Sequence, residues 1–87
     1  MRIQFSSCFK GKYKKLIAKQ PKVRALFETA LALLMKNFKE PSLKTHKLSG
    51  KLKDCWAFYL TYDLRVIFER KKDTIILLNI GTHDEVY

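Results

Sequence analysis

The chain has 87 residues, enough for one domain with a small hydrophobic core, and we expect residues 1–87 to form that single domain. Hydrophobic residues make up 47% and charged residues 30%, which excludes an intrinsically disordered chain. The formal net charge of +10 favours a polyanionic partner, nucleic acid or an acidic protein, over a protein that is basic without consequence.

Targeting, redox and metal signals are weak. No apolar run approaches the ~20 residues of a membrane span, and no secretory signal precedes the first elements, so we expect a cytoplasmic protein that does not contact a membrane. Cys8 and Cys55 are predicted to be reduced and buried or half-buried. His46 and His83 do not fall at zinc-ligand spacing, and no metal or other cofactor is expected.

The N-terminal part predicts a strand and a helix. Arg2 to Phe5 alternates polar and apolar residues, as a short strand does. Ser6 and Ser7 are suitable N-caps for a helix that reaches about Gln20. Its apolar positions recur at helical spacing: Phe9, Tyr13, Leu16 and Ile17.

A second, more apolar helix is predicted from Pro21 to about Lys39, because proline suits the first turn of a helix. It closes at Glu40, since the residue before Pro41 disfavours helix. The two helices form a hairpin. Before Glu28 the chain carries eight Lys or Arg residues and no acid, which describes either a solvated helix face or a surface that grips phosphates or an acidic antagonist.

Leu43 to Lys53 is predicted to be a basic loop that turns at Ser49–Gly50. The strand that follows, Asp54 to Tyr62, is expected to point one set of side chains at the helices and the other at solvent or substrate. The first set is Trp56, Phe58 and Leu60, and the second is Ala57, Tyr59 and Thr61.

Two further strands complete an antiparallel meander. Tyr62–Asp63 is predicted to be a tight turn into Leu64 to Arg70, where Val66 and Phe68 lie on one side and Arg65 and Ile67 on the other. After a turn at residues 71–73, Thr74 to Ile80 is apolar on both faces, as a central strand is. Gly81 is expected to end it, and residues 83–87 to form a short tail.

The predicted fold is therefore α+β: a two-layer sandwich of an N-terminal strand, a helical hairpin and a three-stranded antiparallel meander. One sheet face is covered by the helices, and the other is at least partly open.

Four residues from distant parts of the chain form a candidate site on the open face: His46, Asp63, Arg65 and His83. RNA is cut without metal when its 2′-OH attacks the adjacent phosphate, which needs a base, an acid and positive charge. Histidine suits the proton roles, and the planar guanidinium of arginine suits the phosphate oxygens.

Each residue also has a simpler explanation. His46 is as well explained as loop surface, and His83 as a cap at a strand end. Asp63 is more often a turn former than a base at such a position, and Arg65 has Asp63 and Glu69 as possible ion-pair partners. Tyr87 as a terminal residue is prone to fraying.

Several segments resemble the RelE/ParE superfamily of bacterial toxins, in particular the YafQ-like branch: HKLSG from His46, DCWAFYL from Asp54, YDLRVIF from Tyr62 and NIGTHDEVY from Asn79. The resemblance covers nearly the whole chain. It implies a RelE-like fold and a type II toxin that enters the ribosomal A site, contacts ribosomal RNA, cuts the messenger there without a metal and stops translation. It also implies a cognate acidic antitoxin, a monomeric toxin on its own and a larger assembly with that antitoxin.

The resemblance carries roles residue by residue. His83 matches the histidine of the Gly-Thr-His motif and is expected to be the general acid, with Asp63 or His46 as base and Arg65 stabilising the phosphorane. Tyr87 matches an aromatic residue that stacks on a messenger base.

Tyr59 stands where YafQ-like toxins have a second strand histidine and RelE has a lysine. A phenol donates a hydrogen bond to phosphate but is a poor proton shuttle near neutral pH. Loop lysines complete the expected substrate-binding set, which is Lys44, Lys47, Lys51, Lys53, Tyr59 and Tyr87. The alternatives are a ParE-like toxin that binds gyrase without chemistry, and a basic binding module that has lost its activity.

Overall fold

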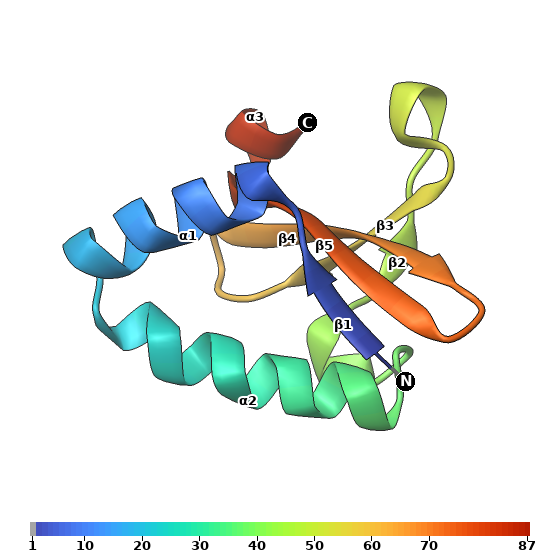
Figure 1. Ribbon diagram of the computed structural model, residues 1–87, viewed down its shortest axis with the longest axis horizontal. Coiled ribbons are helices and arrows are strands. Elements are labelled where there is room, and N and C mark those ends of the chain that lie inside the picture. The colour runs from blue at the N-terminus through green and yellow to red at the C-terminus, as the bar shows by residue number, and fades with distance from the viewer. Residues whose placement is uncertain (1) are drawn as a thin grey trace.

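Two helices and a five-stranded sheet form the layers of the structure, a computed structural model that describes residues 2–87 (Figure 1). The predicted α+β order of N-terminal strand, helical hairpin and meander is confirmed. The elements are β1 (Arg2–Phe5), α1 (Ser7–Lys19), α2 (Lys22–Lys36), η1 (Pro41–Leu43), β2 (His46–Lys47), η2 (Gly50–Leu52), β3 (Cys55–Tyr59), β4 (Leu64–Lys71), β5 (Thr74–Thr82) and α3 (His83–Val86), where η marks a 3-10 turn.

The strands are ordered β1-β5-β4-β3-β2. The pairs β3–β4 and β4–β5 are antiparallel, as predicted for the meander. The pairing of β1 with β5 is parallel and joins Arg2 to Thr74 and Phe5 to Leu77, which the sequence did not indicate. This pairing gives β5 a neighbour on each side, so it is an interior strand, as its two apolar faces indicated, while β4 is the middle strand of the sheet.

Short polar contacts fix where the helices begin and end. The Ser6 hydroxyl accepts a hydrogen bond from the Phe9 amide at 3.0 Å, as a predicted N-cap should, and donates one to the Leu78 carbonyl on β5 at 2.9 Å. α2 ends at Lys36 rather than Lys39. The Asn37 side chain accepts from the Lys39 amide at 3.1 Å, a local bond that competes with continuation of the helix.

The main core lies between the helices and one sheet face. Phe9 of α1 and Phe27 of α2 meet with ring centroids 5.6 Å apart, above Phe58 and Phe68 of the sheet. All four side chains are buried, which confirms the face predicted for Phe58 and Phe68. Trp56 lies at the margin of this core, where its ring meets Phe38 edge-on at 5.2 Å.

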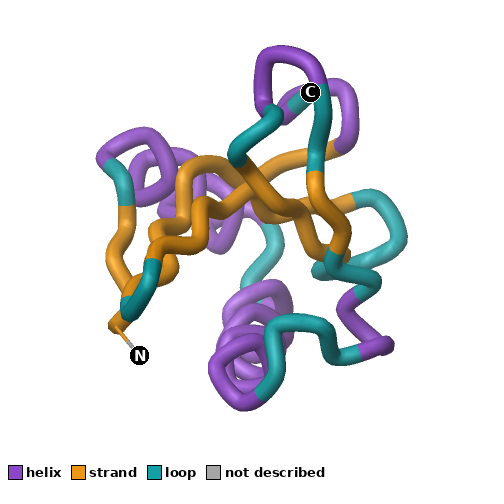
Figure 2. Tube along the Cα trace, turned by 90° about the vertical axis from the view of Figure 1, so that its right-hand side faces the viewer, coloured by secondary structure: helices purple, strands orange, loops and turns teal. Residues whose placement is uncertain are grey.

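The other sheet face is more covered than expected. Ala57, predicted to face solvent or substrate, is 0% exposed, and Ile67, predicted on the same side of its strand as Arg65, is 2% exposed. With Cys55 they form a second, smaller core under Val86 of α3, flanked by Leu48, Leu52 and Leu78. The helical turns on this side are visible in Figure 2, where helical segments lie above and below the strands. The part of this sheet face that stays open to solvent is therefore limited to the end near the β3–β4 hairpin.

Several local expectations need correction. The predicted loop at 43–53 begins at the end of η1 and contains the short strand β2, which pairs with β3, and the 3-10 turn η2. β3 ends at Tyr59, and the hairpin spans residues 60–63 because the Leu64 carbonyl accepts from both the Leu60 and Thr61 amides. β5 continues through Gly81, and the expected tail is the helix α3.

The two cysteines differ in environment. Cys55 is buried and its pKa is raised, first by that burial and then by the nearby carboxylates of Glu69 and Asp54. Cys8 is exposed, so its predicted burial is wrong; its Sγ lies 3.9 Å from Oδ1 of Asn79 on β5. Both thiols are free.

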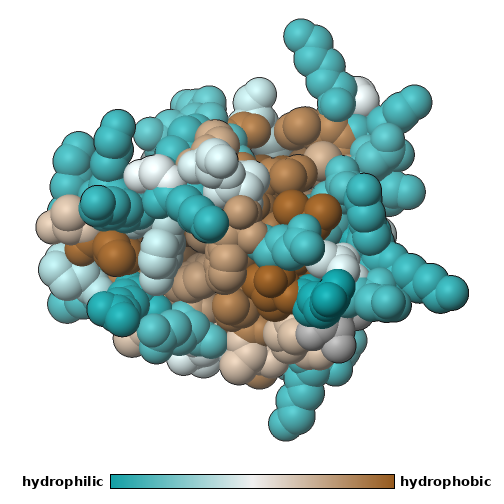
Figure 3. All heavy atoms as spheres, in the orientation of Figure 1, coloured by the Kyte–Doolittle hydropathy of each residue, from teal (hydrophilic) through white to brown (hydrophobic). Residues whose placement is uncertain are grey.

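Apolar and polar side chains are segregated on the surface. The face seen in Figure 1 has an apolar area at its centre with hydrophilic side chains projecting around it (Figure 3). Phe5 of β1 and Leu26 of α2 are among the large hydrophobic residues left exposed, at 39% and 46%. Within residues 2–87, no helix has the length and apolar character needed to cross a membrane.

Candidate active site

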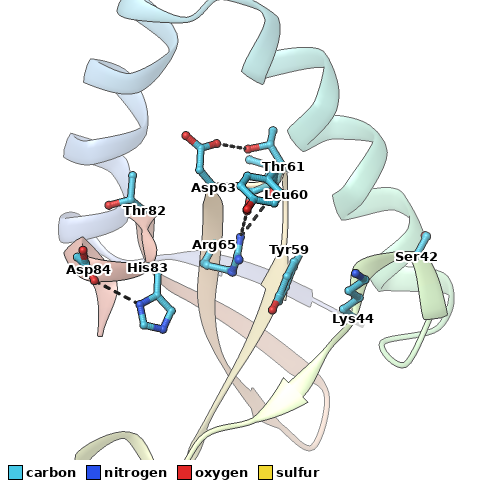
Figure 4. A pocket seen from close by; sticks show the side chains of 11 residues that line it. Ser42, Lys44, Tyr59, Leu60, Thr61, Asp63, Arg65, Thr82, His83 and Asp84 are labelled. Atoms are coloured by element: carbon cyan, nitrogen blue, oxygen red, sulfur yellow. Dashed lines mark hydrogen bonds and ion pairs between the residues drawn. The ribbon is translucent and has the colours of Figure 1, made fainter.

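A hollow of about 720 Å³ lies at the end of the sheet where the β3–β4 hairpin meets the start of α3 (Figure 4). The register of the strands creates it, because Tyr59 pairs with Arg65 and Arg65 pairs with Gly81 across three neighbouring strands. Three of the four predicted catalytic residues line it: Asp63, Arg65 and His83. The fourth, His46, does not.

Arg65 is half-buried on β4 and lies at the floor of this hollow. Its guanidinium carbon is 3.5 Å from the ring centroid of Tyr59, so the two side chains stack. No carboxylate within residues 2–87 lies in ion-pair range of it, so the pairing with Asp63 or Glu69 that the sequence left open does not form. The positive charge of Arg65 is available to an anion.

His83 is the first residue of α3, and a capping box holds that turn. The Thr82 amide donates to Glu85 Oε1 at 2.8 Å, and the Glu85 amide donates in return to the Thr82 side chain. The backbone bond and then the hydroxyl bond from Thr82 lower the pKa of Glu85, and the charges of Lys12 and Lys19 lower it further. The turn therefore presents His83 from a defined backbone.

The imidazole of His83 is mostly exposed, with its Nδ1 3.4 Å from Oδ1 of Asp84. Its ring meets Tyr87 edge-on with centroids 4.5 Å apart. The Nε2 edge is left for a ligand. His83 is thus outside the apolar interior and on the rim of the same hollow as Arg65.

Gly81 and Val86 fix α3 against the sheet. A Cβ at position 81 would lie 2.9 Å from Oε1 of Glu85, closer than Cβ atoms approach in proteins, and 3.1 Å from the Cβ of Glu85, a tight contact. Val86 is 8% exposed and belongs to the second core with Ala57 and Ile67. The absence of a side chain at Gly81 lets the capping carboxylate approach, and the buried valine holds the turn down.

Tyr87 lies between the two histidines. Its ring is 45% exposed, so it is not frayed into solvent. Partial burial raises the pKa of its phenol, the charge of Arg65 opposes that rise, and Tyr59 adds to it. Tyr87 also lines an adjoining hollow of about 450 Å³ together with His46. Tyr87 does not line the main hollow itself, but its ring contacts His83, which does.

His46 reaches the site through Tyr59, with ring centroids 6.1 Å apart. Its Nδ1 lies 3.0 Å from the Lys44 carbonyl, which only accepts, so Nδ1 carries the proton. In the neutral ring the Nε2 lone pair is then free to take a proton. Lys44 has φ 51°, a left-handed conformation unusual for a residue with a side chain, and this turn aims its carbonyl at His46.

Asp63 is engaged in the hairpin. Its Oδ1 accepts from the Thr61 hydroxyl at 2.9 Å, and that hydroxyl oxygen accepts from the Leu64 amide at 3.1 Å. In Figure 4 the carboxylate points toward Thr61 and away from Arg65 and His83. These bonds describe the turn former that hairpin statistics favour.

The predicted basic residues divide into two groups. Lys44 lines the main hollow with its Nζ 5.4 Å from the Tyr59 ring centroid, and Lys51 lines the adjoining hollow beside His46. Lys47 and Lys53 are exposed and line neither, and their role in substrate binding stays a prediction. A third hollow, lined by Lys12, Lys15 and Lys19 of α1, shares Asp63 and Thr82 with the first.

Thr82, Glu85 and Thr61 support the site and were not among the predicted residues. The first two follow the Thr-x-x-Glu pattern of a capping box, which is readable from the sequence. Thr61 carried no comparable signal, because its partner depends on the shape of the hairpin. In the part of the chain from residue 2 to 87, no three His, Cys, Asp or Glu side chains gather as metal ligands would.

Comparison with known proteins places the chain in a family. The model of the YafQ family, described as the bacterial toxin of type II toxin–antitoxin systems, matches residues 1–87. No curated protein sequence matched.

Solved structures agree in fold. A copper-bound mutant toxin from Helicobacter pylori is 27% identical with a TM-score of 0.82, and the match covers 100% of this chain and 99% of that one. YafQ in the DinJ–YafQ toxin–antitoxin complex of E. coli is 23% identical, with a TM-score of 0.80 and coverage of 98% and 94%. A YoeB/ParE toxin from Agrobacterium tumefaciens is 10% identical, with a TM-score of 0.85 and coverage of 95% and 99%.

Proposed function

The chain belongs to the YafQ family, the bacterial toxins of type II toxin–antitoxin systems, and from that premise we propose that it is an endoribonuclease that cuts messenger RNA in the ribosomal A site. The observation that carries the proposal is the shared hollow of Arg65 and His83. It brings the guanidinium of β4, which has no carboxylate partner, and the imidazole at the start of α3 to one place.

The proposed reaction uses the 2′-OH of RNA as nucleophile. Nε2 of His46 takes the proton of that hydroxyl while the 2′-oxygen bonds to phosphorus. The bond from phosphorus to the 5′-oxygen breaks, and His83 gives its proton to that oxygen. The products are a 2′,3′-cyclic phosphate and a 5′-hydroxyl end. We prefer His46 to Asp63 as base because the carboxylate of Asp63 is occupied by Thr61.

Arg65 stabilises the charge that develops on the phosphorane oxygens. Its stacked position leaves the guanidinium without a protein carboxylate, so a phosphate does not have to displace one. Tyr87, half-exposed in the adjoining hollow and in ring contact with His83, is placed to stack on a base next to the scissile phosphate. No metal takes part in this proposal, because the nucleophile and both proton carriers are already present.

The charge distribution supports a ribosomal target. The basic residues of α1 border the third hollow, which shares Asp63 and Thr82 with the candidate site. A strand of nucleic acid seated over Arg65 would pass close to these lysines, whose charge attracts its phosphates. Binding is therefore expected to weaken steeply as the salt concentration rises.

A partner antitoxin is proposed on two observations. DinJ is the partner of E. coli YafQ in the solved complex. The apolar centre of the surface in Figure 3, rimmed by hydrophilic side chains, together with the net charge of +10, suits a chain that is both acidic and amphipathic. We propose that the toxin alone is a monomer and that the antitoxin covers this face together with the basic residues.

The test is cleavage of a translated message in a purified translation system, with new 5′ ends mapped by primer extension. Wild type should cut within the A-site codon, and His83→Ala should lose roughly 10²–10⁴-fold in rate. Arg65→Ala should also lose activity, whereas Arg70→Ala, the same change at the other end of β4, should not.

Two results would contradict the proposal. One is a wild-type toxin that stops growth without new 5′ ends, with His83→Ala equally toxic. The other is inhibition of purified DNA gyrase that survives both histidine substitutions, which would instead support a toxin that binds gyrase.

A further inference from the structure

Tyr59 is the most connected side chain of the site, and its contacts are made by the ring. The guanidinium of Arg65 lies on it at 3.5 Å, the ammonium of Lys44 lies 5.4 Å from its centroid, and His46 meets it edge-on at 6.1 Å. The phenol oxygen of Tyr59 makes no hydrogen bond with any residue from 2 to 87. The ring therefore organises three charged or titratable groups.

The hairpin also holds Arg65, through one nitrogen of its guanidinium. Its Nη1 donates to the carbonyls of Thr61 at 3.2 Å, Tyr62 at 3.0 Å and Leu64 at 3.1 Å. One nitrogen is thus fully used, and the dashed bonds in Figure 4 show it docked on the loop. Nε and Nη2 have no acceptor among residues 2–87. They form the edge that pairs with two oxygens of a phosphate.

These two contacts restrain different motions. The hydrogen bonds fix where Nη1 lies, but a guanidinium held at one nitrogen still turns about that point. The aromatic face of Tyr59 blocks this rotation because the planar group packs flat against it. Together they fix the plane of the guanidinium and hence the direction of its free edge.

We propose that Tyr59 is a positioning residue, which stacks on Arg65 and holds its Nε–Nη2 edge toward the scissile phosphodiester of RNA. The proposal rests on the proposed function for the identity of the ligand. The aromatic ring is what matters, and the phenol hydroxyl takes no part in proton transfer. This differs from the hydrogen bond to phosphate that the sequence predicted for Tyr59.

The chain contains a matched pair outside the site. Arg70, on the same strand, has its guanidinium carbon 3.9 Å from the ring centroid of Phe38. Phe38→Leu removes an aromatic ring from beneath an arginine with no effect expected on the hollow. It also removes the edge contact of Phe38 with Trp56, so it gives an upper bound on what the loss of such a stack costs the fold.

The first measurement is single-turnover cleavage on programmed ribosomes as a function of toxin concentration. Tyr59→Leu should lower the maximal rate about 10²-fold, the size expected from a small misplacement of a catalytic group. The concentration at half-maximal rate should change by less than about threefold. Tyr59→Phe should lose less than about threefold, because phenylalanine keeps the face. Phe38→Leu should stay near wild type.

The second measurement does not need activity. The ¹⁵N relaxation of the Arg65 Nε–H group should show a restrained side chain in wild type and in Tyr59→Phe, and a mobile one in Tyr59→Leu. The resonance is assigned by its loss in Arg65→Lys.

The outcomes separate the two claims. If Tyr59→Phe is as slow as Tyr59→Leu while Arg65 stays restrained, the hydroxyl acts in the chemistry and the positioning role is wrong. If Arg65 is equally mobile in wild type and Tyr59→Leu, the stack does not hold it and the inference also fails. If wild type never cuts RNA but Arg65 loses its restraint in Tyr59→Leu, the proposed function is wrong. The positioning of Arg65 by Tyr59 then still holds, and only the identification of its ligand as a phosphodiester is withdrawn.

Discussion

Truncation of Val86 is expected to lower the RNA cleavage rate by a larger factor than the increase in unfolded protein can explain. Val86→Ala removes two methyl groups from a side chain that is 8% exposed in the second core. At about 0.8 kcal/mol for each buried carbon, and with a small cavity added, the loss is about 2 kcal/mol. Since 1.4 kcal/mol is tenfold in an equilibrium constant, the ratio of docked to undocked α3 falls by about 25-fold.

That loss acts first on α3, because a four-residue helix opens locally before the domain unfolds. His83 and Tyr87 move with it, so cleavage should fall further than the unfolded fraction explains. The unfolding free energy, followed by Trp56 fluorescence in urea, should fall by no more than about 2 kcal/mol. The edge-on contact of the two rings, 4.5 Å between centroids, gives His83 ring protons an NMR shift that reports docking.

Val23→Ala is the matched control. It makes the same truncation at a residue 2% exposed on α2, away from the hollow. It should lower the unfolding free energy by a similar amount and leave both the His83 shifts and the cleavage rate per folded molecule intact. If Val86→Ala and Val23→Ala gave the same His83 NMR shifts and the same cleavage rate per folded molecule, the reasoning would be refuted, because Val86 would then not hold the catalytic turn.

Three further outcomes are expected. The pKa of Glu85 is lowered in the folded state, so its contribution to docking of α3 is complete above pH 4.5, the ordinary pKa, and is lost as the pH falls through the lowered pKa. The NMR shifts of the Val86 methyl groups should follow this loss in wild type. Glu85→Gln keeps the capping bond and should abolish the pH dependence of these shifts. Gly81→Ala should displace the Glu85 carboxylate and slow cleavage, since the new Cβ lies 2.9 Å from Oε1, and a crystal structure with the bond from the Thr82 amide to Oε1 intact would contradict this. Ser6→Ala should cost about 1 kcal/mol in urea unfolding, because the Phe9 amide loses its cap.

The sequence predicted the large elements well, because their signals are local. The helical spacing of Phe9 and Phe27 placed both in the core, and the alternation in β3 and β4 oriented Phe58 and Phe68 correctly. The parallel pairing of β1 with β5 could not be predicted, since four residues of alternating character do not specify a partner.

The second core was missed for a different reason. Ala57 and Ile67 alternate as outward-facing residues should, and what buries them is Val86, which belongs to a segment too short to show a helical period. The capping box Thr82–Glu85 was the available signal for that turn.

The candidate site was predictable in part. Arg65 and His83 were expected to meet because adjacent antiparallel strands bring β4 and the end of β5 together, and they line one hollow. The position of His46 depends on a left-handed Lys44, for which the sequence has no glycine to mark the turn. Asp63 acts as a turn former because its carboxylate accepts a hydrogen bond from the Thr61 hydroxyl, two residues earlier.

The parallel pairing of β1 with β5 has a consequence for biosynthesis. A nascent chain that has emerged only through α2 carries Phe27, Ala30 and Leu34 with no sheet to cover them, because the strand that links the helical layer to the meander is β5. More than thirty further residues must be synthesised before β5 is available and the helical hairpin can pack on the sheet. During that interval its exposed hydrophobic stripe is a substrate for chaperones and proteases.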